Sequence, residues 1–336
     1  MRTFTKLTAA ALACTMLTGA ASAQEMQFFR IGTGGAGGTY FPIGGIIANA
    51  ISNPPGSRAC DAGGNCGVPG LVAIAQSTNA SAHNVNAIQA GQMEAGLSGA
   101  ATLHFAYHGI GAFEGNARPD LRVIANLYPE DLHLVLPEGA GLEGLAALEG
   151  HRVGIAQAGS GTQIAVELIL GAHGITRENI DEAELNNAQS AERIADGQLD
   201  AYFYAAGTPV AAMIQLDNTA GMELYSFTEE EVAAANEAVP YYIPSTIPAG
   251  TYPGVEYDVE TVAVSGMLVT NANIDDDLIY EITRALWSGT ARRLLDGGHP
   301  KGRAITQETA LDGIDGIGVP LHPGAERFYR EAGMIE

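Results

Sequence analysis

Apolar and polar positions follow two periods along this chain of 336 residues. Short apolar runs predict buried strands at residues 28–32, 71–76, 94–99, 151–157, 201–207 and 222–227. Apolar residues spaced three to four apart predict helices at residues 41–53, 83–92, 101–109, 141–151, 163–174, 192–200, 208–216, 227–239 and 277–295. The proline-rich residues 240–254 predict a loop. Because strands and helices alternate, the predicted fold class is α/β.

Two extended stretches are longer than the other predicted strands. They occupy residues 121–137 and 259–270. Strands of this length can run through two packing units, so we expect the chain to cross between two lobes there. The corresponding division places residues 24–130 and 262–336 in lobe I and residues 131–261 in lobe II.

A glycine-rich turn follows the first predicted strand. Gly32, Gly34 and Gly37 spell G-x-G-x-x-G, which is also the pattern of a dinucleotide-binding turn. That function needs an acid about 20 residues further on, after a second strand, and the acid present, Asp61, lies between two cysteines. A nicotinamide cofactor is therefore not expected. A glycine turn before a helix still presents free N–H groups and a positive dipole end, which bind carboxylates as readily as phosphates.

A second turn of the same kind opens another helix. Residues 158–162, AGSGT, follow the strand predicted at 151–157. One glycine-capped helix from each lobe, aimed at the gap between them, predicts a type II-like periplasmic-binding-protein clamshell with two hinge-crossing strands. The alternative is that these glycines only make tight turns, and that Ser160 and Thr162 are ordinary helix caps.

The amino terminus has the three-part pattern of a secretory signal. Arg2 and Lys6 precede an apolar run, and Ala21-Ser22-Ala23 precedes Gln24, so we expect a signal peptide at residues 1–23 and a periplasmic protein released by its cleavage. A lipid anchor at Cys14 is the alternative, although the residues before it lack the expected leucine. In an oxidising compartment the closely spaced Cys60 and Cys66 predict a disulfide.

The charge of the chain limits its partners. The formal net charge is −22, and it becomes −24 when Arg2 and Lys6 leave with residues 1–23, which contain no acid. Such a surface repels phosphate backbones, so no nucleic-acid partner is expected. An anionic small molecule would have to be captured by local dipoles.

Several stretches together resemble the TAXI family, the TRAP-associated extracytoplasmic immunogenic proteins. They are GTGGAGGTYFPIGG, SAHNVNAIQAGQ, YHGIGAF, YPEDLHLV, AGSGTQ, PYYIPSTIPAGTYPG and LHPGAERFYRE, within residues 27–332. The resemblance implies a periplasmic solute-binding subunit that closes on a small organic acid or amino acid, with glutamate and 2-oxoglutarate as examples. It also implies delivery to a sodium-coupled TRAP permease, whose small and large membrane subunits can be fused. We expect a monomer.

The resemblance carries ligand-binding roles onto matching positions. They are Gly34, Gly35, Thr39 and Tyr40 in the first turn, Ser81 and Asn84 in the next helix, and Ser160, Gly161 and Thr162 in the second turn. Gln163 stands where many relatives have Arg, which makes a doubly charged ligand less favoured. We also predict that Tyr204, Gly207 and Thr208 contact the ligand, because they lie at a strand end that faces a helix start. Two further candidates, for the hinge or the cleft, are Tyr241 and Tyr242.

An enzyme is the competing class. His104 and His108 are four residues apart, but the stretch lacks the Glu of a HExxH hydrolase, so no metal is expected. The residues before Ser160 do not form a G-x-S-x-G nucleophile turn. We therefore expect neither catalysis nor a cofactor, with a secreted hydrolase or transferase as the minor alternative. A ligand sensor that signals to a membrane receptor would use the same clamshell.

Overall fold

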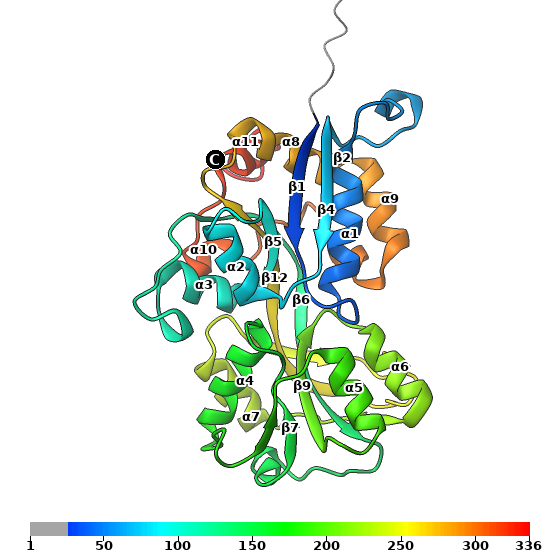
Figure 1. Ribbon diagram of the computed structural model, residues 1–336, viewed down its shortest axis with the longest axis vertical. Helices are drawn as coiled ribbons and strands as arrows, with labels where there is room; N and C mark the ends of the chain where they lie inside the picture. Colours follow the sequence, from blue (N-terminus) through cyan, green and yellow to red (C-terminus); the bar gives the residue numbers. More distant parts are fainter. Residues whose placement is uncertain (1–25) are drawn as a thin grey trace, which may run out of the picture.

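The structure is a computed structural model that describes residues 26–336. The predicted signal peptide, residues 1–23, and Cys14 lie outside the described residues. Within them the chain forms two α/β lobes, one above the other in Figure 1. The upper lobe contains β1 (Gln27–Gly32), α1 (Tyr40–Ile51), β2 (Ser52–Asn53), β3 (Val68–Pro69), β4 (Leu71–Gln76), α2 (Ser81–Gln89), β5 (Ala95–Gly99) and α3 (Ala100–His108).

The lower lobe is formed by the middle of the chain. Its elements are β7 (Arg152–Gly154), α4 (Gly161–Ala172), β8 (Asp181–Ala183), α5 (Asn187–Ala195), β9 (Ala201–Ala206), α6 (Ala211–Ala220), β10 (Met222–Leu224), α7 (Glu229–Ala238) and β11 (Ile243–Ile247). The chain then returns to the upper lobe, which it completes with α8 (Asp276–Leu286), α9 (Gly289–Gly298), α10 (Ile314–Ile317) and α11 (Pro323–Glu331). Short 3-10 helices lie at Cys60–Ala62, Gly111–Phe113, Leu145–Leu148 and Pro300–Ala304.

Two long antiparallel strands, β6 (Leu121–Pro137) and β12 (Val259–Asn271), join the lobes. The sheet runs in the order β4-β1-β5-β12-β6-β9-β7-β8. In the upper lobe β5 pairs with β12, opposite Gly266 to Thr270, and in the lower lobe β9 pairs with β6, opposite Asp131 to Val135. Each long strand therefore belongs to the sheets of both lobes, which confirms the predicted clamshell with two crossing strands. The exact predicted lobe boundaries stay a prediction.

Several predicted elements have different bounds. The predicted helix at 277–295 is two helices, because Ser288 accepts a hydrogen bond from the N–H of Ala291 and so begins α9. The predicted helix at 208–216 begins at Ala211 instead, since the hydroxyl of Thr208 donates to Asp131 and does not cap a helix. The predicted loop at 240–254 contains β11, which pairs with β12 at an edge where Pro244 is tolerated.

The bounds of two other helices also differ from the predicted ones. Residues 192–200 were predicted as a helix, whereas α5 begins at Asn187 because Asn186 and Gln189 form a capping box. The helix predicted at 141–151 is only the short 3-10 helix Leu145–Leu148. The sulfur atoms of Cys60 and Cys66 are bonded in the loop after α1, as the spacing of the two residues predicts.

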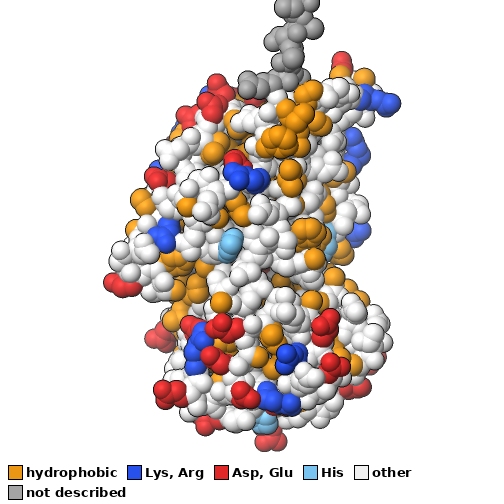
Figure 2. Space-filling view, in the orientation of Figure 1, with side chains coloured by type: hydrophobic (Ala, Val, Ile, Leu, Met, Phe, Trp, Pro, Cys, Tyr) orange, Lys and Arg blue, Asp and Glu red, His pale blue; other side chains and the backbone are white. Residues whose placement is uncertain are grey.

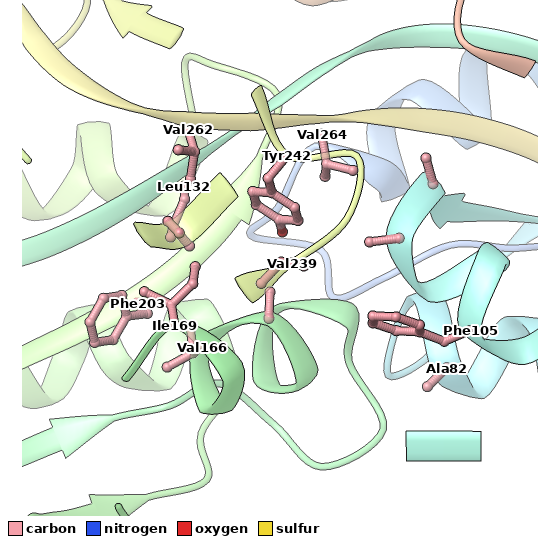
Figure 3. Close-up of a cluster of buried hydrophobic side chains, with 14 of the residues drawn as sticks. Ala82, Phe105, Leu132, Val166, Ile169, Phe203, Val239, Tyr242, Val262 and Val264 are labelled. Carbon is pink, nitrogen blue, oxygen red and sulfur yellow. The ribbon is translucent and has the colours of Figure 1, made fainter. Parts of the chain in front are cut away.

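One apolar cluster continues from lobe to lobe. Figure 3 shows Phe105 of α3 on one side, Val166 and Ile169 of α4 on the other, and Tyr242 between them below β12. Leu132 and Phe203 belong to the same cluster. The two lobes thus share apolar packing at the hinge, in addition to the strands that connect them.

A buried polar cluster lies at the same level of the hinge, around Asp131 of β6. Its Oδ2 accepts from the Thr208 hydroxyl (2.7 Å) and its Oδ1 accepts from the Ser245 hydroxyl (2.7 Å). The ammonium of Lys301, on an upper-lobe 3-10 helix, lies 3.7 Å from Oδ2, with both side chains largely buried. Asp131 therefore connects three segments that are far apart in the sequence.

Replacing Lys301 with Met should lower the free energy of unfolding by about 3 kcal/mol, because it leaves the buried Asp131 carboxylate without its cation. Denaturant unfolding followed by circular dichroism measures this change. Arg284→Met is the control, since Arg284 forms an exposed ion pair with Glu281 that contributes about 0 to 1 kcal/mol. Equal losses in the two variants would contradict a special role for the Asp131 cluster.

Candidate ligand-binding site

A cavity of about 330 Å³ lies between the lobes, beside the crossing strands. Its walls come from both lobes and include the first glycine turn, the start of α4, the end of β9 and Tyr242. The volume is within the range of small-molecule sites. Most of the wall is apolar or backbone, so polar recognition depends on a few groups.

Five helices begin at the cavity wall. The residues that precede α1, α2, α3, α4 and α5 all line it, and they are Thr39, Ala80, Gly99, Ser160 and Asn186. No side chain in the described part of the chain caps α1, α2 or α3, whereas Ser160 and Asn186 cap their own helices. Each helix start carries about half a positive charge, so the cavity favours an anionic group.

The lobes touch on two sides of this cavity. On one side the Thr39 hydroxyl donates to the carbonyl of Gly207 (2.5 Å) and the Asn187 amide donates to the carbonyl of Gly37 (3.1 Å). On the other side the N–H of His83 donates to the carbonyl of Gly159 (3.0 Å). The structure therefore represents a closed arrangement of the clamshell.

Closure requires glycine at two positions. A Cβ on Gly161 would lie 2.8 Å from the Thr102 hydroxyl and 2.9 Å from the Ser81 hydroxyl, both in the opposite lobe. A Cβ on Gly38 would lie 2.0 Å from the Tyr204 hydroxyl. The start of α4 and the first glycine turn can approach the other lobe only because these residues have no side chain.

Nine of the thirteen predicted ligand-binding residues line the cavity: Gly34, Gly35, Thr39, Tyr40, Ser81, Ser160, Gly161, Thr162 and Tyr204. They come from segments between 34 and 204 and meet only in the folded chain. Their contact with a ligand stays a prediction. Ser160 also caps α4, since its hydroxyl accepts from the N–H of Gln163, so the alternative role expected for it is present as well.

The structure does not bring the other four predicted residues to the cavity wall. Asn84 donates its amide to the carbonyls of Thr33 and Leu97, which fixes the turn after β1. Gln163 donates its amide to the carboxylate of Glu184 (2.9 Å) and does not line the cavity. Gly207 and Thr208 act at the hinge, through the contacts with Thr39 and Asp131 described above.

Sequence reasoning missed the acidic residue in the wall, Glu130. It lies in β6, next to Asp131, and two adjacent acids within a long, mostly apolar strand are the signal that could have revealed it. Tyr242, one of two neighbouring tyrosines considered for the hinge or cleft, lines the cavity. The other, Tyr241, instead places its hydroxyl 3.2 Å from Nδ1 of His104.

The carboxyl of Glu130 is 4% exposed, and burial raises its pKa to about 8. A hydrogen bond from Tyr40 and the charge of Lys301 act in the opposite direction, and Asp131 raises the pKa further. Its Oε1 has no hydrogen-bond partner in the described part of the chain. The lining residues include no Lys, Arg or His. Glu130 is therefore a buried carboxyl without an adjacent cation of its own.

The histidine pair has other partners. Nδ1 of His104 lies 2.8 Å from the carbonyl of Ile317, and the two imidazole rings of His104 and His108 pack against each other. Among residues 26–336, no group of three or more His, Cys, Asp or Glu side chains has a geometry suited to a metal ion. Over the same residues, none of the helices is long and apolar enough to cross a membrane.

Gly161→Ala should disfavour the closed arrangement, because the new methyl group overlaps the Thr102 and Ser81 hydroxyls. We expect a larger radius of gyration by small-angle X-ray scattering. Gly171→Ala is the matched control on the same helix, since nothing lies within 4 Å of its Cβ position. An unchanged radius in Gly161→Ala would show that the lobes adjust without opening.

Glu130→Gln should change how stability depends on pH. A carboxyl with a raised folded-state pKa binds more protons folded than unfolded, so its contribution to stability falls as pH rises from its ordinary value to about 8. We expect the variant to be more stable than the wild type at pH 9 and to lose this advantage at pH 4. Urea unfolding of both proteins across this range tests it, and a pH-independent difference would contradict the burial of an ionisable group.

Comparison with known structures shows the fold only. A protein from Bordetella bronchiseptica RB50 is similar at 14% identity, with 91% of this chain and 82% of that chain covered and a TM-score of 0.50. The alkanesulfonate-binding protein SsuA from Xanthomonas axonopodis pv. citri, bound to MOPS, is 18% identical, with coverage of 91% and 84% and a TM-score of 0.48. An ancestral arginine-binding protein bound to arginine is 13% identical, with coverage of 81% and 97% and a TM-score of 0.47.

The sequence itself matches a family over nearly its whole length. The match covers residues 31–333, which include both lobes, the two crossing strands and every residue of the cavity wall. This chain belongs to the NMT1-like family.

Proposed function

We propose that this protein is a periplasmic solute-binding receptor that closes on a small organic acid. The observation that carries the proposal is the closed cavity between two lobes, at whose wall five helices begin. These helix starts attract an anionic group, and closure removes it from water. The signal-like residues 1–23 and the disulfide between Cys60 and Cys66 support the location.

The motif resemblance supports a more specific assignment to the TAXI type of TRAP transporter. In that assignment the ligand is glutamate, 2-oxoglutarate or a related carboxylate, and the receptor delivers it to a sodium-coupled permease. The cavity wall contains no guanidinium, so within this class a related acid with one carboxylate is preferred to glutamate or 2-oxoglutarate, which carry two. Membership of the NMT1-like family does not distinguish a TRAP permease from another class of permease.

Reconstitution separates transport from sensing. If a permease gene neighbours the gene of this protein, that permease in proteoliposomes should take up labelled ligand only when this receptor and an inward sodium gradient are both present. Uptake driven by ATP would identify a different permease class. A partner that phosphorylates itself on ligand addition would support the sensor alternative, and turnover of the ligand by the purified chain would support an enzyme.

A thermal-shift screen tests the receptor directly. The chain from Gln24 should be stabilised by a binding carboxylate, by about 2.7 kcal/mol when the ligand is a hundredfold above Kd. Tyr40→Ala should weaken that binding about tenfold or more, because Tyr40 lines the cavity, while Tyr280→Ala, on an outer helix, should not. Equal affinities in the two variants, measured by calorimetry, would place the ligand elsewhere.

A further inference from the structure

We propose that Glu130, with Tyr40, Tyr204 and Tyr242, forms a subsite for a cationic amine of the ligand, so that this cavity selects a small zwitterion over a plain carboxylate. The proposal rests on the proposed function, since it assigns the second polar end of the same ligand. The carboxylate end would face the helix starts, and the ammonium end would face the hinge strand β6.

The first support is the position of the Glu130 carboxyl. It reaches the cavity wall from β6 and is held between glycines on neighbouring strands. A Cβ on Gly266 would lie 2.4 Å from its Oε1, and a Cβ on Gly99 would lie 3.6 Å from its Oε2. A side chain at position 266 would displace the carboxyl, whereas a Cβ at position 99 would only be in van der Waals contact with it, so the glycine in β12 leaves room for an acid at this point of the wall.

The second support is the missing counter-ion. The nearest basic group that acts on Glu130 is Lys301, which lies 3.7 Å from Oδ2 of Asp131 and within 3.4 Å of the Thr208 hydroxyl. Lys301 does not line the cavity. Ionising a buried carboxyl is costly, and a cation on the ligand beside Glu130 at the cavity wall would lower that cost.

The third support is the aromatic surroundings. Tyr40 of α1, Tyr204 of β9 and Tyr242, just before β11, line the same cavity, and the charge of Glu130 acts on all three hydroxyls. Tyrosine faces attract ammonium groups, with about 0.5 to 2 kcal/mol for each favourable contact. A carboxyl among tyrosine rings, without a basic side chain in the wall, is chemically suited to an amine.

Binding of an amine should release a proton. Six other groups face Glu130: Tyr40 of α1, Tyr128 and Asp131 of β6, Tyr204 of β9, Tyr242 just before β11, and Lys301. Burial raises the pKa of the empty carboxyl to about 8, so at lower pH it holds a proton that an ammonium group displaces. Affinity for the amine should therefore rise with pH up to that value.

Calorimetry with four probes tests the subsite: butyrate, 2-aminobutyrate, 4-aminobutyrate and butylamine. At pH 6.5, an amino acid should bind at least tenfold more tightly than butyrate. Measurements in buffers of different ionisation enthalpy should show close to one proton released per ligand bound. Glu130→Gln, which has nearly the same shape, should lose both the preference and the proton release, whereas the exposed control Glu149→Gln should keep both.

The outcomes separate this inference from the receptor proposal. If butyrate binds as tightly as the amino acids in the wild type and in Glu130→Gln, the subsite is wrong and the receptor for acids stands. Binding that weakens with rising pH without proton release would show Glu130 as a hydrogen-bond donor to the ligand, and would also overturn the subsite. If butylamine alone binds, the subsite stands and the organic-acid receptor fails. If no probe binds, both proposals fail.

Discussion

The antiparallel pair β6 and β12 is the constraint on which the rest of the structure depends. Each strand contributes hydrogen bonds to the sheets of both lobes, so neither lobe can be completed without the segment that leads into the other. The pairing shifts register between Gly266 and Met267, close to Glu130 and Asp131. The hinge, the buried acidic pair and the base of the cavity therefore occupy the same short stretch of these two strands.

Adjacent residues on one strand point to opposite faces, and the acidic pair shows the consequence. Asp131 is directed to a polar cluster in which it meets a lysine and two hydroxyls, while Glu130 lines the cavity. Two carboxyl groups of the same chain segment thus have different environments. Asp131 connects three segments of the chain, and Glu130 is the carboxyl that we propose contacts the ligand.

Local patterns predicted the lobes and both crossing strands, because hydrophobic periodicity and strand length are properties of short segments. The motif resemblance, and for Tyr204 the position at a strand end, indicated Gly34, Ser160 and seven other residues that line the cavity. They failed where a long-range contact decides the outcome. Thr208 has the residue type of a helix start, but its hydroxyl donates to Asp131, and Gln163 donates to Glu184 and does not line the cavity. Glu130 was missed because its burial depends on glycines in β5 and β12.

The positive ends of five helices are made of backbone N–H groups, which among amino-acid substitutions only a change to proline removes directly. Mutations in the cavity wall can therefore alter which solute fits while the attraction for an anion persists. Such a scaffold can diverge in ligand choice through gradual change of side chains, without passing through forms that have lost binding altogether.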